Sequence, residues 1–107
     1  MAADVSVLRF SIFPTDLPHG VSTRQGGVSE GPFASLNLSG KVGDDPAAAG
    51  ENRDRLMRTV TGRPQQDLVV LTQVHGTRVT PATSADRGRG ILPGAALPEE
   101  ADGLTTA

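Results

Sequence analysis

The sequence contains no cysteine, tryptophan or tyrosine, and only three phenylalanines. Without Cys, these 107 residues hold no disulfide framework, no thiolate nucleophile and no Cys-based metal cluster. Aromatic side chains bury the largest apolar areas, so their scarcity predicts a thin core and a marginally self-sufficient domain. The length also excludes the two-domain layout of many enzymes, because it has room for one small domain only.

The sequence also lacks a dominant charge and a long apolar run. The sequence has ten basic and twelve acidic residues, which gives a formal net charge of -2, and residues of neither sign form a dense run. This balance offers no electrostatic footprint for nucleic acid or for an anionic membrane. No stretch has the length of a transmembrane helix, and residues 1–13 lack the basic and apolar regions of a signal peptide. We therefore expect a soluble cytoplasmic protein with neither of these partners.

The best-specified element is a helix from Asp45 to Gly62. Asp45 is a favoured N-cap residue directly before Pro46 at the first helical position, and Gly62 is a favoured residue after a helix end. At about 100° per residue, one stripe of this helix carries Ala49, Asn52, Leu56 and Val60. Asn52 therefore lies on the buried face, where its amide needs hydrogen-bond partners. We predict that Asn52 ties a neighbouring loop to the helix.

Several other segments have the composition of β-strands. They are residues 5–13, 19–24, 68–75 with a partner at 78–80, and 101–106. Gly76-Thr77 would join 68–75 to 78–80 as a two-residue hairpin turn of type II′. The period of two then places Gln73 and His75 on one face of the strand.

Two longer segments are interpreted as loops. The first reaches to about Gly43, and the second, 82–100, is rich in Gly and Pro and is predicted to be flexible. Together these elements predict an α+β fold. A mixed β-sheet would contain the hairpin, and the helix from Asp45 to Gly62 would pack on one of its faces.

Two local patterns could carry chemistry. The guanidinium fork of Arg24 next to the flexible Gly26-Gly27 backbone resembles an anion cradle, although paired glycines are common in turns. His75 is at most one metal ligand, because zinc sites require three or four convergent ligands. The alternative for His75 is a hydrogen-bonded turn residue. Asp45 is explained by helix capping, without acid-base chemistry.

A series of short motifs makes these patterns more specific. In chain order they are HGVSTRQGGVSEGPF (19–33), SLNL (35–38), VGDDP (42–46), ENR (51–53), QVHG (73–76) and ADG (101–103). Their order resembles the N-terminal part of the YfiH family, also called the multicopper polyphenol oxidase or laccase-domain family. We therefore expect residues 1–107 to be the N-terminal portion of a single YfiH-type domain.

The resemblance implies a purine nucleoside phosphorylase that also deaminates adenosine, with adenosine, inosine, guanosine and methylthioadenosine as phosphorolysis substrates. It implies zinc, or copper in the older laccase interpretation, held by one Cys and two His. The His of the family's Gln-Val-His-Gly motif is present as His75. The Cys and second His belong to Thr-Ala-Asp-Cys and His-Ala-Gly-Trp motifs, which would lie beyond Ala107. The sequence therefore predicts a truncated product whose missing partner is the C-terminal half of its own domain.

The candidate phosphate- and substrate-binding residues are Arg24, Gly26, Gly27, Asn37 and Gln73, with His75 as the metal ligand. Arg24 and the two glycine amides would hold phosphate in the same cleft as His75. Asn37 would contact the nucleoside, and Gln73 would orient metal-bound water or His75 itself. For Asn37 and Gln73, loop-bracing hydrogen bonds are an equal alternative. For the whole chain, the alternative function is a non-catalytic remnant or binding module, which the missing ligands favour.

Overall fold

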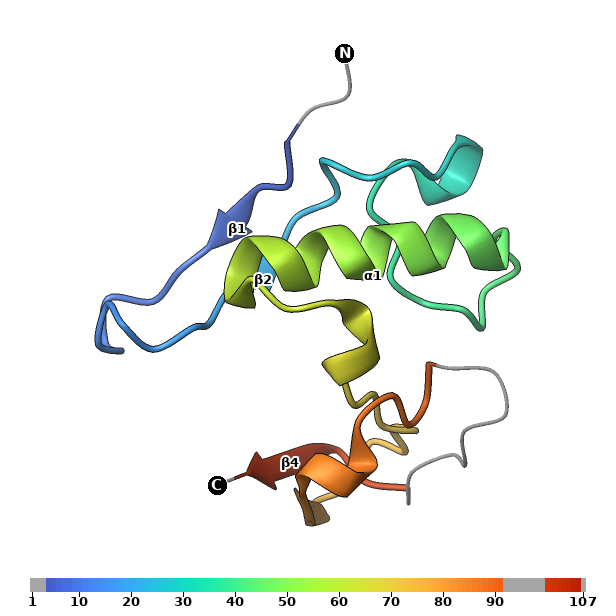
Figure 1. The fold of residues 1–107 in the computed structure, drawn as a ribbon. Helices are drawn as coiled ribbons and strands as arrows, with labels where there is room; N and C mark the ends of the chain where they lie inside the picture. The colour runs from blue at the N-terminus through green and yellow to red at the C-terminus, as the bar shows by residue number, and fades with distance from the viewer. Residues whose placement is uncertain (1–3, 92–99, 107) are drawn as a thin grey trace. The chain divides into compact units, whose positions relative to one another are not determined.

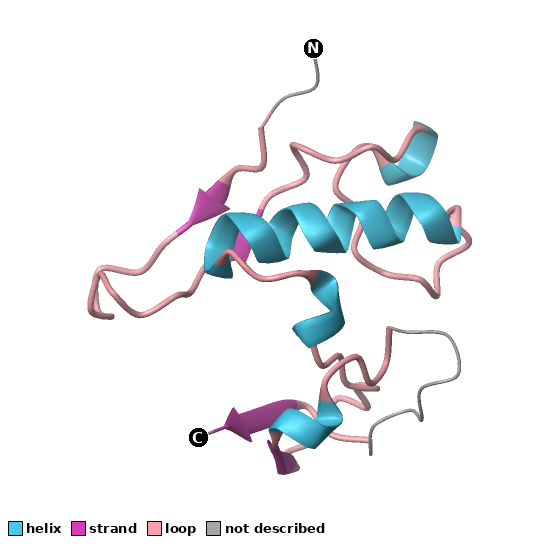
Figure 2. Ribbon diagram, in the orientation of Figure 1, coloured by secondary structure: helices cyan, strands magenta, loops and turns pink. Residues whose placement is uncertain are grey.

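The computed structural model describes residues 4–91 and 100–106, and these confirm the predicted α+β class (Figures 1 and 2). The chain forms two compact units, Met1–Gln65 and Gln66–Ala107. The elements of the first unit are β1 (Val7–Leu8), β2 (Val21–Ser22), the 3-10 helix η1 (Gly31–Phe33) and α1 (Pro46–Thr61). The 3-10 helix η2 (Gln65–Asp67) crosses the boundary, and β3 (Val79–Ala82), η3 (Ser84–Asp86) and β4 (Gly103–Thr106) follow.

Helix α1 begins and ends where its capping residues predict. The side chain of Asp45 accepts a hydrogen bond from the Ala47 N–H at 3.0 Å, and Pro46 occupies the first turn. Gly62 has a φ of 73° and donates its N–H to the Arg58 carbonyl at 3.0 Å. Glycine adopts this left-handed conformation without a Cβ clash, so it ends the helix cleanly.

The predicted role of Asn52 is confirmed. Its side chain is fully buried, and its Oδ1 accepts a hydrogen bond from the Val28 N–H at 2.8 Å. Its Nδ2 donates to the Ser29 Oγ and to the Asn37 carbonyl, each at 2.8 Å. All three partners belong to the segment between β2 and α1, which runs alongside the helix in Figure 1. One amide thus ties this segment to the helix at two separate points.

Two arginines of α1 hold the same segment through its carbonyl groups. Arg53 Nη1 donates to the Leu38 carbonyl, and Arg55 Nη1 donates to the Gly26 carbonyl, each at 3.1 Å. Arg53 is partly buried, and this burial lowers its pKa from the ordinary value. The helix therefore presents hydrogen-bonding side chains, rather than a purely apolar stripe, to the loop beside it.

The predicted thin core is confirmed among the described residues. The buried apolar side chains are Leu36, Ala49 and Ala101. Larger apolar side chains remain open to solvent, such as Ile12, which is 83% exposed. Because apolar burial is small, hydrogen bonds from buried polar groups take a large share in specifying the loops.

The predicted first strand, 5–13, is much shorter in the structure. β1 pairs antiparallel with β2, with Val7 opposite Ser22, so the second predicted strand is confirmed in part. Beyond β1 the chain turns, and the Phe13 N–H donates to the Phe10 carbonyl at 3.3 Å. The Phe13 ring contacts the His19 ring with centroids 4.9 Å apart. The apolar residues that suggested a long strand therefore form a turn with aromatic contacts.

The predicted hairpin does not form, and within the described residues two separate two-stranded sheets replace the single mixed sheet. β3 pairs in parallel with β4, with Val79 opposite Gly103. The segment before β3 finds other partners, because the Thr72 carbonyl accepts a hydrogen bond from the Ala101 N–H at 3.2 Å. Pairing with distant residues thus overrides the local turn signal. β4 confirms the last predicted strand.

Part of the segment 82–100, predicted to be a flexible loop, has regular structure. η3 carries a capping box, in which the Thr83 side chain accepts from the Ala85 N–H and the Asp86 carboxylate accepts from the Thr83 N–H. The Gly88 N–H then donates to the Leu68 carbonyl at 2.8 Å. Residues 92–99 lie outside the described residues. The flexibility of this loop stays a prediction.

Across residues 4–91 and 100–106 we find no helix with the length and apolar character needed to cross a membrane.

Replacing Asn52 with Ala removes the buried amide and leaves its hydrogen-bond partners without a partner. We expect the free energy of unfolding to fall by about 1–3 kcal/mol, because buried polar groups without partners carry a desolvation penalty. Urea denaturation followed by circular dichroism measures this loss. Thr59→Ala, at an exposed position of the same helix, is the control and should stay within about 0.5 kcal/mol of the parent. Equal losses in both variants would contradict the role of Asn52.

Candidate functional site

Arg24 and Asn37, two of the predicted binding residues, line the same hollow in the first unit. Its volume is about 390 Å³, and its remaining lining residues are Pro32, Phe33, Ala34 and Leu36. Pro32 and Phe33 belong to η1, so the short helix forms part of the wall. The hollow is an open depression on the surface, with a volume in the range of small-molecule sites.

The backbone of Arg24 is held firmly at this hollow. Its carbonyl accepts hydrogen bonds from the Ser35 N–H at 2.9 Å and from the Leu36 N–H at 3.0 Å. Its exposed guanidinium donates from Nη2 to the Ala34 carbonyl at 3.2 Å. A guanidinium has several N–H donors, so one contact with a carbonyl leaves others for an anion. The position therefore combines a fixed backbone with an accessible positive charge.

Gly26 and Gly27 have a packing role in the structure. Gly26 has a φ of 99°, and a Cβ there would collide with the Val5 backbone. A Cβ on Gly27 would collide with the Ser35 carbonyl. The Gly27 N–H already donates to the Ser35 Oγ at 3.1 Å, and neither glycine is among the residues that line the hollow. Phosphate binding by these amides stays a prediction, and Arg24 is the member of the predicted cradle that reaches the hollow.

The side chain of Asn37 braces its own loop. Its Nδ2 donates to the Ser39 carbonyl and to Asp44 Oδ2, each at 3.0 Å, and its Oδ1 accepts from the Ser39 N–H at 3.2 Å. These contacts match the loop-bracing alternative. Contact between Asn37 and a nucleoside stays a prediction.

Asp44 and Ser29 are two structural partners that sequence reasoning missed. Asp44 Oδ2 accepts from the Ser29 Oγ at 2.6 Å as well as from Asn37. The hydrogen bond from Ser29, followed by that from Asn37, lowers the pKa of Asp44 from its ordinary value. Since Ser29 also accepts from Asn52, a continuous hydrogen-bonded chain connects α1 to the wall of the hollow. The position of Asp44 directly before the helix cap was the available signal.

His75 lies in the second unit and is exposed, with a φ of 59°. This left-handed conformation costs a residue with a Cβ roughly 1–2 kcal/mol. The prediction that Gln73 and His75 share the face of a strand is therefore wrong, because the period of two requires extended backbone. Gln73 is also exposed, and its role toward His75 stays a prediction.

The Asp102 carboxylate holds the backbone around His75. Its Oδ1 accepts hydrogen bonds from the Val74 N–H at 3.1 Å and from the His75 N–H at 3.0 Å. Its Oδ2 accepts from the Gly76 N–H at 2.6 Å. Sequence reasoning gave Asp102 no role of its own, although the Ala-Asp-Gly motif around it was visible.

The described residues do not form a complete metal site. Within the described ranges, no three His, Cys, Asp or Glu side chains gather in a way that could hold a metal ion. His75 is thus a single candidate ligand, and one imidazole does not hold zinc in a tetrahedral site. Arg24 and His75 belong to different units, so a cleft shared between them stays a prediction.

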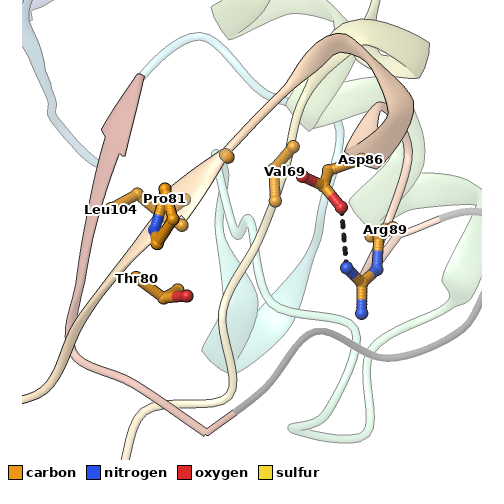
Figure 3. A pocket seen from close by; sticks show the side chains of 7 residues that line it. Val69, Thr80, Pro81, Asp86, Arg89 and Leu104 are labelled. Atoms are coloured by element: carbon orange, nitrogen blue, oxygen red, sulfur yellow. Dashed lines mark hydrogen bonds and ion pairs between the residues drawn. The ribbon is translucent and has the colours of Figure 1, made fainter. Parts of the chain in front are cut away.

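A smaller hollow of about 190 Å³ lies in the second unit, beside β3 and β4 (Figure 3). Asp86 and Arg89 both line it, and Arg89 Nη1 donates to Asp86 Oδ1 at 2.7 Å. The Thr83 N–H, followed by Arg89, lowers the pKa of the Asp86 carboxyl. Because these two charges engage each other, the hollow is a weaker candidate than the one at Arg24.

A family model described as "Multi-copper polyphenol oxidoreductase laccase" matches residues 18–107. The chain belongs to this laccase family. The match covers the same motifs that carry the resemblance noted in the sequence, so that prediction is confirmed. The older copper interpretation survives in the family's name.

Curated relatives in the laccase family are named purine nucleoside phosphorylases. The chain is 41% identical over 87 residues to YlmD of Geobacillus stearothermophilus, covering 81% of this chain and 31% of YlmD. It is 46% identical over 81 residues to a phosphorylase of Pseudomonas aeruginosa, covering 71% of this chain and 32% of that protein. The chain therefore spans about a third of the length of these relatives.

Solved structures of the laccase family share the fold of this chain. The crystal structure of YlmD matches with a TM-score of 0.72 at 42% identity, covering 81% of this chain and 32% of YlmD. The Bacillus licheniformis hypothetical protein YfiH also matches with a TM-score of 0.72, at 30% identity, covering 91% of this chain and 40% of YfiH.

The lowered pKa of Asp44 predicts that the fold loses stability in acid. A lowered pKa means that the charged form stabilises the fold at neutral pH, and that this contribution is lost as pH falls below the ordinary value of 3.8 through the lowered folded value. The difference in unfolding free energy between the parent and Asp44→Asn should therefore shrink in that acid range. Urea denaturation across pH measures it. Glu30→Gln, which removes an exposed loop carboxylate, should lack this dependence, and matching pH profiles would contradict the prediction.

Proposed function

We propose that this chain supplies the phosphate-binding part of a purine nucleoside phosphorylase, with Arg24 as the phosphate contact. The observation that supports this proposal is that the Arg24 guanidinium is exposed at the hollow that Asn37 also lines. The names of the relatives support the reaction class. Adenosine, inosine, guanosine and methylthioadenosine are the proposed substrates.

In phosphorolysis, a phosphate oxygen forms a bond to the anomeric carbon of the ribose while the bond from that carbon to the purine nitrogen breaks. The purine leaves with the electron pair and takes up a proton, so the products are the free base and ribose 1-phosphate, or 5-methylthioribose 1-phosphate when methylthioadenosine is the substrate. A guanidinium matches two phosphate oxygens with paired N–H donors. Arg24 would therefore bind and orient the attacking phosphate, and the rigid backbone around it would preserve that position.

Deamination of adenosine is the second proposed activity and needs a different group. Zinc, when bound, supplies a water of lowered pKa for hydrolytic chemistry. His75 would contribute one ligand, and the remaining ligands would come from outside these 107 residues, which contain no Cys. The chain by itself therefore does not perform this reaction in our proposal. The single ligand also favours the rival function, a non-catalytic remnant or binding module.

Arg24→Ala tests the phosphate contact. The test protein is a chimera in which the 107 residues replace the matching segment of YlmD, a substitution that the TM-score of 0.72 supports. We expect the KM for phosphate to rise roughly ten- to hundredfold, because a hydrogen-bonded charged contact contributes about 1.5–3 kcal/mol. The KM for phosphate of Arg24→Lys should lie between those of the parent and Arg24→Ala, because lysine keeps the charge but lacks the paired donors of a guanidinium. Steady-state phosphorolysis of inosine at varied phosphate measures the effect.

The matched control is Arg9→Ala. Arg9 is also an exposed arginine whose guanidinium donates to a backbone carbonyl, that of His19 at 2.9 Å. Its loss should leave the KM for phosphate unchanged. If Arg24→Ala and Arg9→Ala behave alike, Arg24 is a structural residue and the phosphate assignment fails. A correctly folded chimera without any phosphorolysis would instead favour the remnant.

His75→Ala in the same chimera tests the metal ligand. We expect bound zinc and inosine formation from adenosine to fall together, since a site with three protein ligands loses one of them. The melting temperature should change little beyond the loss of zinc itself, because the His75 side chain is exposed. Zinc per chain is measured by elemental analysis. The 107-residue chain alone should bind zinc weakly and release no inosine, and robust metal-dependent turnover by it would overturn this proposal.

A further inference from the structure

The Asp102 carboxylate makes an unusual set of contacts with the second unit's backbone. Its two oxygens accept hydrogen bonds from three successive N–H groups, those of Val74, His75 and Gly76. All three donors point at one side chain, which makes this arrangement a backbone nest filled by an anion of the protein itself. The segment therefore takes its shape from a residue far away in the sequence.

Asp102 is itself anchored on both sides. Its own N–H donates to the Arg78 carbonyl at 3.0 Å. The preceding residue, Ala101, is fully buried and donates its N–H to the Thr72 carbonyl at 3.2 Å. The next residue, Gly103, begins β4 and lies opposite Val79 of β3. A side chain that starts from such a fixed backbone can impose a conformation on its partners.

The partner that most needs this support is His75. Its φ of 59° lies in a region that residues with a Cβ seldom adopt. The next residue is Gly76, which would take a positive φ at no steric cost, yet the left-handed conformation falls on the histidine. The hydrogen bonds to Asp102 come from His75 itself and from the residues on both sides of it.

We infer that Asp102 is the positioning residue of His75: its carboxylate holds residues 74–76 in a bend that sets the direction in which the imidazole leaves the chain. In this inference Asp102 acts through the backbone of His75 and its neighbours, so it is a positioning residue and not a catalytic one. The importance of that direction rests on the proposed function, in which His75 is a ligand.

Asp102→Asn tests the inference in the 107-residue chain. The amide keeps the shape of the carboxylate, but its NH₂ group meets a backbone N–H and cannot accept from it. We expect the amide proton signals of residues 74–76 to shift and their hydrogen exchange to accelerate about tenfold, with β3, β4 and α1 unchanged. The coupling constant between the N–H and Hα protons of His75 should move away from its left-handed value. NMR spectroscopy measures all three quantities.

Two further variants separate the inference from general destabilisation. Glu100→Gln removes the same charge two residues earlier at an exposed position, and should leave the signals of residues 74–76 in place. His75→Gly removes the Cβ that disfavours the left-handed conformation, so adding it to Asp102→Asn should restore part of the lost exchange protection. Unchanged signals in Asp102→Asn, or equal changes in Glu100→Gln, would overturn the inference.

The chimera with YlmD distinguishes this inference from the proposed function. There, Asp102→Asn should weaken zinc affinity about tenfold, the usual effect of removing a group that orients a ligand, while Glu100→Gln leaves it unchanged. Unaltered zinc affinity in Asp102→Asn, in a chimera where His75→Ala loses zinc, would overturn the positioning role. If His75→Ala retains zinc, the proposed metal ligand fails, while the NMR result still decides whether Asp102 sets the conformation of His75.

Discussion

The first unit depends on the hydrogen bonds of the buried Asn52 amide. It is a polar group with zero exposure, and it satisfies an N–H, a hydroxyl and a carbonyl of the adjacent segment. In the unfolded chain, water hydrates these groups. In the folded chain they all have partners only when the segment lies against α1 in one register. Through Ser29 the same network reaches Asp44 and Asn37, which connects the helix to the hollow at Arg24.

In the second unit, hydrogen bonds to one side chain also fix a loop, and the side chain is that of Asp102. Asp102 holds the bend at His75 through backbone N–H groups, as Asn52 and two arginines hold the loop beside α1. A large apolar core would position loops by packing, but the described residues bury few apolar side chains. Directional hydrogen bonds therefore take over much of this task, and both candidate functional side chains, Arg24 and His75, lie on segments placed in this way.

These placements agree with a protein that belongs to the laccase family and spans about a third of its matched relatives. In our proposal, phosphate binding needs a cation with spare N–H donors, and Arg24 at the hollow would supply it. A metal centre needs several ligands from separate segments, and the described residues hold no cluster of three such side chains. The two proposed activities therefore differ in how many of the groups that they need are found in these 107 residues.

Helix α1, its two ends and the burial of Asn52 follow from the sequence alone, because capping chemistry and the helical period are local properties. The thin core follows equally from composition. The tertiary structure decided the parallel pairing of β3 with β4 and the left-handed conformation of His75. Both depend on contacts across long separations, such as the 27 positions between His75 and Asp102. The local sequence pattern at Gly76 contains no information about such a distant partner. The three hydrogen bonds to the Asp102 carboxylate stabilise a different conformation from the predicted turn.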